Sequence, residues 1–346
     1  MDEIPYLFAQ DVSASLPKTM LYLSDAVLDK LGCRWSEAAK NNKKNVCFFT
    51  LNIASPDNQK IHYLLQGDFL PPEASESFPD GSITLEELYN MYARNQCQYG
   101  QFEEITVFRC TDPTKAPNTM EMDRFSSTFI RGVGSMMMHP SKLRVKQEVS
   151  SRSAAFLMPS IFRELAQFSQ IKVLDIPYIG EESYEFLETK IKNSNQLEVL
   201  IRGNWPKKTE DLMLLGLNLR SFRNFDASQA PQLYVTLEMV QIMLKNWVAE
   251  KGANKFYMDA MYGYTLDDVK RFGLDALDPE VRETVLIPEE RTWSSPRYCL
   301  EFKMKSGGAL WNLSVEHNTQ QDRAFVHTVN NEFQLKLYDG SSKNGG

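Results

Sequence analysis

Short apolar segments alternate with amphipathic helical patterns between Ile171 and Met258, and this alternation constrains the fold more than any other feature of the chain. Four of the segments have the apolar and aromatic content of buried strands: 171–176, 197–202, 219–224 and 255–260. Apolar residues recur at helical intervals between them, so strand and helix follow each other in turn. This order favours parallel strands joined by helical crossovers.

The intervals between the strand starts indicate a repeat. The first two, 26 and 22 residues, are close to the period of leucine-rich arrays, whereas the third, 36 residues, departs from it. The sequence therefore predicts an α/β fold with a degenerate leucine-rich-repeat-like array. We expect the four strands to be parallel neighbours in one curved sheet, with a helix over 236–250 covering one face. Such arrays offer an extended surface to a partner, so the pattern favours binding over catalysis.

Strand and helix also alternate before residue 171. The stretches 46–53 and 60–65 are predicted strands because they are rich in β-branched and aromatic residues. Thr84 and Glu87 have the spacing of a capping box, which predicts a helix that begins there and continues to about Arg94. Two further strands are expected, at 104–109 and 142–149. The array is therefore expected to begin near residue 46.

The two ends of the chain differ from this array. Residues 1–45 have the pattern of small helices, the third of which holds Trp35, Ala38 and Ala39. After residue 283 the pattern favours strands at 283–287, 298–304, 310–315 and 324–329, with a hairpin turn at 306–308. The expected organisation is a helical segment (1–45), an α/β array (46–282), a strand-rich part (283–340) and a frayed tail (341–346).

Composition restricts the function classes. The formal net charge of −7 and the pI near 5.4 argue against a dedicated nucleic-acid-binding protein, which would be basic. The chain has no signal-peptide pattern and no uncharged run of about 18 residues, so we expect an intracellular protein, cytoplasmic or nuclear, that does not contact a membrane. Its five cysteines are an odd number scattered along a long chain, and reduced, buried thiols are expected. Partners are therefore expected to be proteins.

Catalytic and metal-binding motifs are not found in the sequence. His62, His139, His317 and His327 have no second histidine or cysteine at a metal-ligand spacing. The glycines of 132–134 lack the lysine of a phosphate-binding loop and are predicted to form a turn. Paired carboxylates such as those at 103–104 and 181–182 are expected to be solvated. We therefore predict no catalytic residue, no metal site and no cofactor, and expect that the protein is not an enzyme.

Two groups of residues are candidates for contact with a partner. Met136, Met137 and Met138 form a run of adaptable side chains of the kind found at promiscuous binding surfaces, although burial under a neighbouring strand is the alternative. Trp205 follows a predicted strand, and an exposed tryptophan there would be a binding anchor. Its alternative is a tryptophan that plugs the edge of the sheet.

Motifs at both ends of the chain resemble a known family. The start of the chain, with Ile4-Pro5 where the family has Leu-Pro and with 35–39 further on, is similar to the F-box-like start of a large nematode family of F-box and F-box-associated proteins. The segments that resemble its type 2 F-box-associated domain are 196–200, 236–239, 244–247 and 300–304. They include Lys245-Asn246-Trp247, which resembles the family's Lys-x-Trp.

The resemblance implies a substrate receptor of a cullin-type ubiquitin ligase, in which no residue performs bond chemistry. Its N-terminal helices would bind a Skp-type adaptor, and its array would capture an unknown target protein. The adaptor-facing residues that the resemblance implies are Ile4, Pro5, Leu7, Phe8, Val12 and Leu16. The same residues would serve equally as a seam between helices. The alternative is thus a scaffold or antagonist outside the ligase, with the same binding surface and a self-packed N-terminus.

Overall fold

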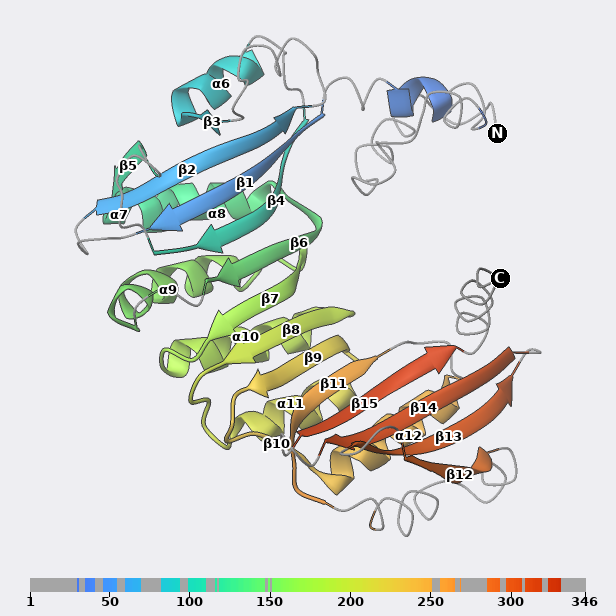
Figure 1. The fold of residues 1–346 in the computed structure, drawn as a ribbon. Coiled ribbons are helices and arrows are strands. Elements are labelled where there is room, and N and C mark those ends of the chain that lie inside the picture. The colour runs from blue at the N-terminus through green and yellow to red at the C-terminus, as the bar shows by residue number, and fades with distance from the viewer. Residues whose placement is uncertain are drawn as a thin grey trace, which may run out of the picture. The chain divides into compact units, whose positions relative to one another are not determined.

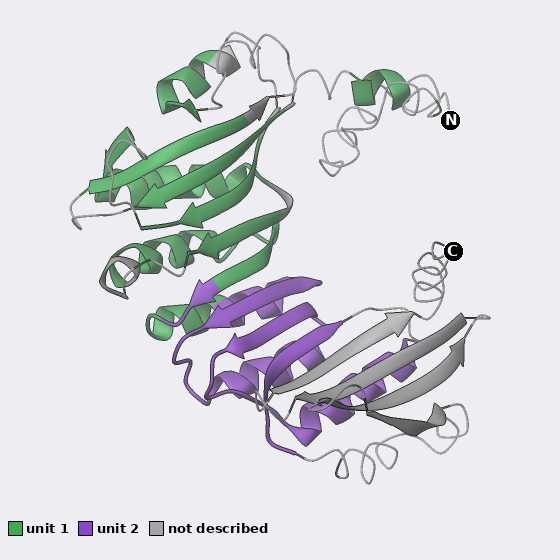
Figure 2. Ribbon diagram, viewed as in Figure 1, with its two compact units in different colours: residues 1–175, 179–186 green, residues 176–178, 187–346 purple. Residues whose placement is uncertain are grey.

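The structure is a computed structural model of the whole chain. The residues that it describes are 30, 35–40, 46–54, 60–69, 82–93, 99–109, 116, 118–146, 149, 151–250, 256–264, 268, 285–292, 297–306, 309–318 and 323–330, the last four ranges as backbone only. They form a mixed α/β fold (Figure 1). The chain divides into two compact units, one of residues 1–175 and 179–186 and the other of residues 176–178 and 187–346 (Figure 2). The predicted boundaries after residues 45 and 282 border stretches outside the described residues.

The first unit contains a mixed sheet with strand order β3-β2-β1-β4-β6-β7. β1 pairs with β4, β4 with β6 and β6 with β7 in parallel, whereas β2 pairs antiparallel with β1, β3 and β5. The strands are β1 (Val46–Ala54), β2 (Lys60–Phe69), β3 (Ser82–Ile83), β4 (Tyr99–Val107), β5 (Asn118–Glu121), β6 (Met137–Val145) and β7 (Ile171–Pro177). The helices are α6 (Leu85–Ala93), α7 (Met122–Arg124), the π-helix η2 (Phe125–Phe129), α8 (Ile130–Ser135), α9 (Ser151–Leu165) and α10 (Glu181–Asn193), of which α10 continues into the second unit.

Most of the elements predicted in this unit are confirmed. The strands at 46–53 and 60–65 are present, and those predicted at 104–109 and 142–149 begin about five residues earlier, as β4 and β6. The capping box is confirmed, because the Glu87 N–H donates to Thr84 Oγ1 at 3.1 Å and the Thr84 N–H donates to Glu87 Oε2 at 2.6 Å. A helix over 35–40 contains the predicted Trp35, Ala38 and Ala39.

The turn predicted at 132–134 is wrong, because these residues lie inside helix α8. The glycine at position 134 has a packing role. A Cβ built there would lie 2.4 Å from Cε2 of Phe168, so only glycine lets this ring approach the helix. His139, predicted in a loop, belongs to strand β6.

A nearly buried carboxylate joins α8 to α9. Glu164, whose side chain is 8% exposed, accepts from Nε of Arg131 at 2.9 Å and from Nε of Arg163 at 3.2 Å, and its Oε2 lies 2.7 Å from Nη2 of Arg131. Burial alone would raise the pKa of Glu164, but the hydrogen bonds and charges of the two guanidinium groups outweigh it and hold the pKa below its ordinary value of 4.5. The stabilisation that the ionised Glu164 gives to the fold is therefore fully present above the ordinary pKa of 4.5. It is lost as the pH falls through the lowered pKa.

We expect Glu164→Gln to reduce the free energy of unfolding by about 1–3 kcal/mol at neutral pH, because a charge-assisted pair is lost. The difference between wild type and variant should shrink as the pH falls below about 4.5, the ordinary pKa of this group. Urea denaturation at several pH values measures this difference in the free energy of unfolding. A difference that stays constant into the acid range would contradict the lowered pKa of Glu164.

The second unit has the strand order β8-β9-β11-β15-β14-β13-β12, with β10 paired to β11. β8, β9 and β11 are parallel neighbours, and β11, β15, β14, β13 and β12 pair antiparallel in that order. The strands are β8 (Leu197–Arg202), β9 (Phe222–Gln229), β10 (Tyr234–Val235), β11 (Tyr257–Tyr262), β12 (Val285–Thr292), β13 (Arg297–Ser306), β14 (Ala309–Asn318) and β15 (Arg323–Asn330). Helices α11 (Thr209–Asn218) and α12 (Leu237–Ala249) lie on the same face of this sheet (Figure 1).

The parallel pairing predicted for the last three strands of the array is confirmed in β8, β9 and β11. β9 begins at Phe222, three residues later than predicted, because the C-terminal turn of α11 occupies residues 219–221. α12 begins as predicted: Thr236 Oγ1 accepts from the Met239 N–H at 3.3 Å. The predicted hairpin is also confirmed by the pairing of Ser306 with Ala309.

Candidate functional site

The six residues proposed to face an adaptor, Ile4, Pro5, Leu7, Phe8, Val12 and Leu16, lie outside the described residues. The helix over 35–40 that follows them in the chain is described. Its Ser36, Ala38 and Ala39 are buried, the two alanines almost completely, whereas Glu37 is exposed. One face of this helix is therefore covered.

Trp205 is not the exposed anchor that the binding prediction requires. Its side chain is fully buried, and its ring lies 5.3 Å from the ring of Tyr178 between centroids. Trp205 lies three residues after the end of β8, and its ring is buried in the second unit. This burial contradicts the exposed anchor; whether the ring plugs the edge of the sheet stays a prediction.

The two methionines of the run whose side chains are described, Met136 and Met137, are not exposed either. Met137 is 5% exposed at the first position of β6, and Met136 is half-buried in the turn before it. The side chain of Met138 lies outside the described residues. Burial by the sheet accounts for Met137, because alternate residues of a buried strand point into the core.

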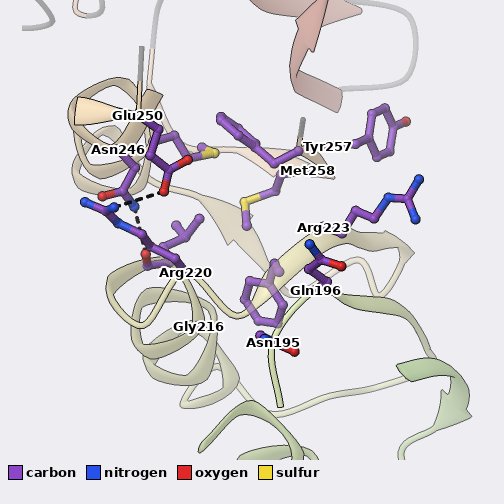
Figure 3. Close-up of a pocket in the computed structure, with 13 residues that line it drawn as sticks. Asn195, Gln196, Gly216, Arg220, Arg223, Asn246, Glu250, Tyr257 and Met258 are labelled. Atoms are coloured by element: carbon purple, nitrogen blue, oxygen red, sulfur yellow. Dashed lines mark hydrogen bonds and ion pairs between the residues drawn. The ribbon is translucent and has the colours of Figure 1, made fainter. Parts of the chain in front are cut away.

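The residues that do form a concave site come together in the second unit. A pocket of about 340 Å³ opens at the amino ends of β8, β9 and β11 and beside the C-terminal turns of α11 and α12 (Figure 3). Its lining comes from five segments: Asn195 and Gln196; Gly216 and Leu217; Arg220, Phe222 and Arg223; Met243, Asn246 and Glu250; and Phe256, Tyr257 and Met258.

The interior of the pocket is apolar. Leu217, Met243 and Met258 line it, and these three residues are 6%, 1% and 1% exposed. Phe222 is half-buried, and its ring approaches Gly216 so closely that a Cβ on Gly216 would lie 2.1 Å from Cε2 of Phe222. The absence of a side chain at Gly216 is therefore what allows Phe222 to line the pocket.

Two arginines lie on opposite sides of the pocket (Figure 3). Nη1 of Arg220 is 3.0 Å from Oε1 of Glu250, and Nη1 of Arg223 is 3.2 Å from Oε1 of Glu198. In each pair the arginine is the more exposed partner: the side chains of Arg220 and Arg223 are 49% and 63% exposed, against 16% for Glu250 and 37% for Glu198. The solvent-facing charge of both pairs is therefore positive.

The backbone at Arg220 adopts a conformation that favours glycine. Helix α11 ends in a Schellman motif, in which the Ser221 N–H donates to the Gly216 carbonyl at 2.9 Å and the Arg220 N–H donates to the Leu217 carbonyl at 3.2 Å. Arg220 occupies the left-handed position of this motif with φ of 54°. A non-glycine residue costs about 1 kcal/mol or more in this region.

Gln196 has a similar conformation, with φ of 56°, directly before β8. Within the part of the chain that the structure describes, these two are the non-glycine residues with φ in the left-handed region, and both line this pocket. Strain of this kind persists where the surrounding structure enforces it and tends to occur at functional sites.

Asn246 and Tyr257 complete the polar lining. Nδ2 of Asn246 donates to the Leu217 carbonyl at 2.8 Å and so satisfies an acceptor at the end of α11. The hydroxyl of Tyr257 donates to Oδ2 of Asp259 at 3.3 Å. The lining residues thus offer guanidinium and amide donors beside the apolar side chains of Leu217, Met243 and Met258.

Across the described ranges, no group of three or more histidine, cysteine or acidic side chains comes together in a way that could hold a metal ion. Among the described helices, none is both long and apolar enough to cross a membrane. Cys47, expected to be a reduced and buried thiol, is buried and is not part of a disulfide.

Comparison of the chain with protein-family models, with curated proteins and with solved structures found no match.

Sequence patterns did not single out this pocket. Its residues come from five separate segments, and most of them belong to helix ends or strand starts that look ordinary in the sequence. One sequence feature could have drawn attention to it. The chain passes from α11 to β9 through Asn218-Leu219-Arg220-Ser221, where a helix end would be expected to carry glycine.

Proposed function

We propose that the protein is a protein-interaction module that acts as an F-box-like substrate receptor of a cullin-type ubiquitin ligase. The pocket of the second unit would capture the target protein, and the N-terminal segment would bind a Skp-type adaptor. The observation that carries the proposal is the composition of the pocket, in which arginine, tyrosine, phenylalanine and methionine surround an apolar interior. These are the residue types enriched at protein interfaces.

The location of the pocket supports a protein ligand over a cofactor. Small molecules and nucleotides bind α/β sheets at the carboxyl ends of the strands, whereas this pocket lies at the amino ends of β8, β9 and β11. Leu219, next to Arg220 in the chain, is 51% exposed, although leucine is usually buried. A partner that covered the pocket would also cover this side chain.

The leucine-rich-repeat-like interpretation belongs to the same proposal. The succession β8-α11-β9-α12-β11 supplies two strand–helix units followed by a strand, with both helices on one face. Repeats of this kind present their turns as a continuous binding surface. In this interpretation the pocket lies along the row of turns that precede the strands, at the amino ends of β8, β9 and β11.

The alternative is a scaffold or antagonist that works outside the ligase. One observation favours it: Ser36, Ala38 and Ala39 are already buried in the helix over 35–40. A self-packed N-terminus would use such small residues as an internal seam and would leave no surface for an adaptor. The second unit would bind a partner in the same way in both cases.

Co-purification of the full-length chain with a Skp-type adaptor tests the ligase proposal. We expect the wild type to retain the adaptor and the Leu7→Asp, Phe8→Asp double variant to lose it. Two carboxylates buried in the interface would cost several kcal/mol, enough to abolish a micromolar complex. Lys30→Glu is the matched control, because it changes the net charge by the same amount at an exposed position.

The Lys30→Glu variant should retain the adaptor as the wild type does. If the wild type retains no adaptor, or if the double variant retains as much as the wild type, the ligase role is wrong and the scaffold is the better account.

A further inference from the structure

We propose that the pocket of the second unit recognises a segment of a partner protein in which a large apolar side chain is flanked by aspartate or glutamate. This inference rests on the proposed protein-binding function and names the chemistry of the partner. The apolar side chain would enter between Phe222, Met243 and Met258, and the flanking carboxylates would meet Arg220 and Arg223.

The interior selects an apolar side chain. Met243 and Met258 are flexible and polarisable, so they can adapt to leucine, methionine or phenylalanine. The volume of about 340 Å³ is at the small end of the range for ligand pockets, about 300–1,000 Å³, which suits a few side chains better than a dinucleotide. An apolar side chain of the partner, once bound, would also cover the ring of Phe222 and exclude water from it.

The rim selects the flanking charge. Glu250 and Glu198 are the less exposed partners of their ion pairs, so an approaching segment meets the guanidinium groups first. Each guanidinium group has five N–H donors. It can therefore donate to a carboxylate of the partner while it keeps its ion pair with the glutamate of this chain. Because Arg220 and Arg223 lie on opposite sides of the pocket (Figure 3), they can contact acidic residues on both sides of the inserted apolar side chain. Lysine or arginine in these flanking positions would meet like charge.

The conformation of Arg220 supports a role in recognition. Glycine would fit the Schellman motif of α11 without strain, yet this position carries a long, charged side chain. The ion pair with Glu250 holds that side chain beside the pocket. A residue that is unfavourable for the backbone and carries a charge at the rim of a pocket is more consistent with ligand binding than with stability.

Three libraries of short fluorescent peptides test the proposal with the full-length chain. All have leucine, methionine or phenylalanine at the centre, and the flanking positions carry aspartate or glutamate, lysine or arginine, or serine and glutamine. We expect the acidic library to bind at least about tenfold more tightly than the basic one in fluorescence anisotropy, and to weaken as salt rises. In a sample with ¹³C-labelled methionine methyl groups, the signals of Met243 and Met258 should shift on binding.

The variants Arg220→Gly and Arg223→Gln should each reduce the preference for the acidic library by about threefold or more, as the loss of an exposed charge contact predicts. Arg220→Gly suits the left-handed backbone, so the fold should be kept, and thermal melting checks this. Arg163→Gln removes an exposed arginine from the first unit, where the side chain of Arg163 is 68% exposed, and should leave the preference unchanged.

Equal binding of the acidic and basic libraries would overturn the inference, as would unshifted methyl signals or an unchanged preference in both pocket variants. Such a failure is distinct from failure of the ligase proposal, which adaptor co-purification reports independently.

Discussion

Replacing Trp247 with alanine is expected to lower the free energy of unfolding by about 3–5 kcal/mol, the usual cost of truncating a large core side chain. Trp247 is 1% exposed and belongs to the buried stripe of α12, together with Met239, Val240, Met243 and Leu244. Met243 of this stripe also lines the pocket, so a collapse around residue 247 would be expected to distort the site as well. Urea denaturation followed by circular dichroism measures the loss.

Lys245 provides the control on the same helix. Its side chain is exposed, so Lys245→Ala should change the stability by no more than about 0.5 kcal/mol. If Trp247→Ala were as mild as the lysine variant, Trp247 would not be the core residue that its burial indicates.

Gly216→Ala is expected to reduce stability by about 1–3 kcal/mol and to abolish peptide binding to the pocket. The new methyl group would lie 2.1 Å from Cε2 of Phe222, so the ring would have to leave its position in the pocket wall. Thermal melting measures the first effect, and fluorescence anisotropy with the acidic peptide library measures the second.

A second helical glycine separates this clash from the intrinsic preference of helices for alanine. A Cβ on Gly132, in α8, would meet nothing within 4 Å. Gly132→Ala should therefore be neutral or stabilise the protein by up to about 1 kcal/mol, and peptide binding should be unaffected. A Gly216→Ala variant that behaved like Gly132→Ala would show that Phe222 is free to move and does not define the pocket.

Local patterns predicted much of the fold because each depends on residues close together in the chain. The capping box at Thr84 and the cap at Thr236 are sequence-local hydrogen bonds, and both are present. The parallel order of β8, β9 and β11 followed from the helical crossovers between them. Trp247 has a helical spacing to Val240 and Leu244, and all three are buried on α12 together with Met239 and Met243.

Features that depend on tertiary packing were not predictable in the same way. The glycine at position 134 looked like part of a turn because the sequence does not reveal that Phe168 packs against it. Trp205 looked like a possible anchor because the sequence does not show how the chain folds back after β8. The pocket combines residues from five segments, and only the fold brings Asn195 and Tyr257 to the same site.

The Schellman position of Arg220 has a consequence for how such a protein can change over generations. A single base change converts any arginine codon into a glycine codon, and glycine is the residue that this backbone favours. Loss of the proposed recognition is therefore one mutation away and relieves backbone strain, so the mutant chain is expected to accumulate as well as its parent. In this proposal only selection for partner binding maintains the arginine, and lineages released from that selection should lose the charge first and the scaffold later.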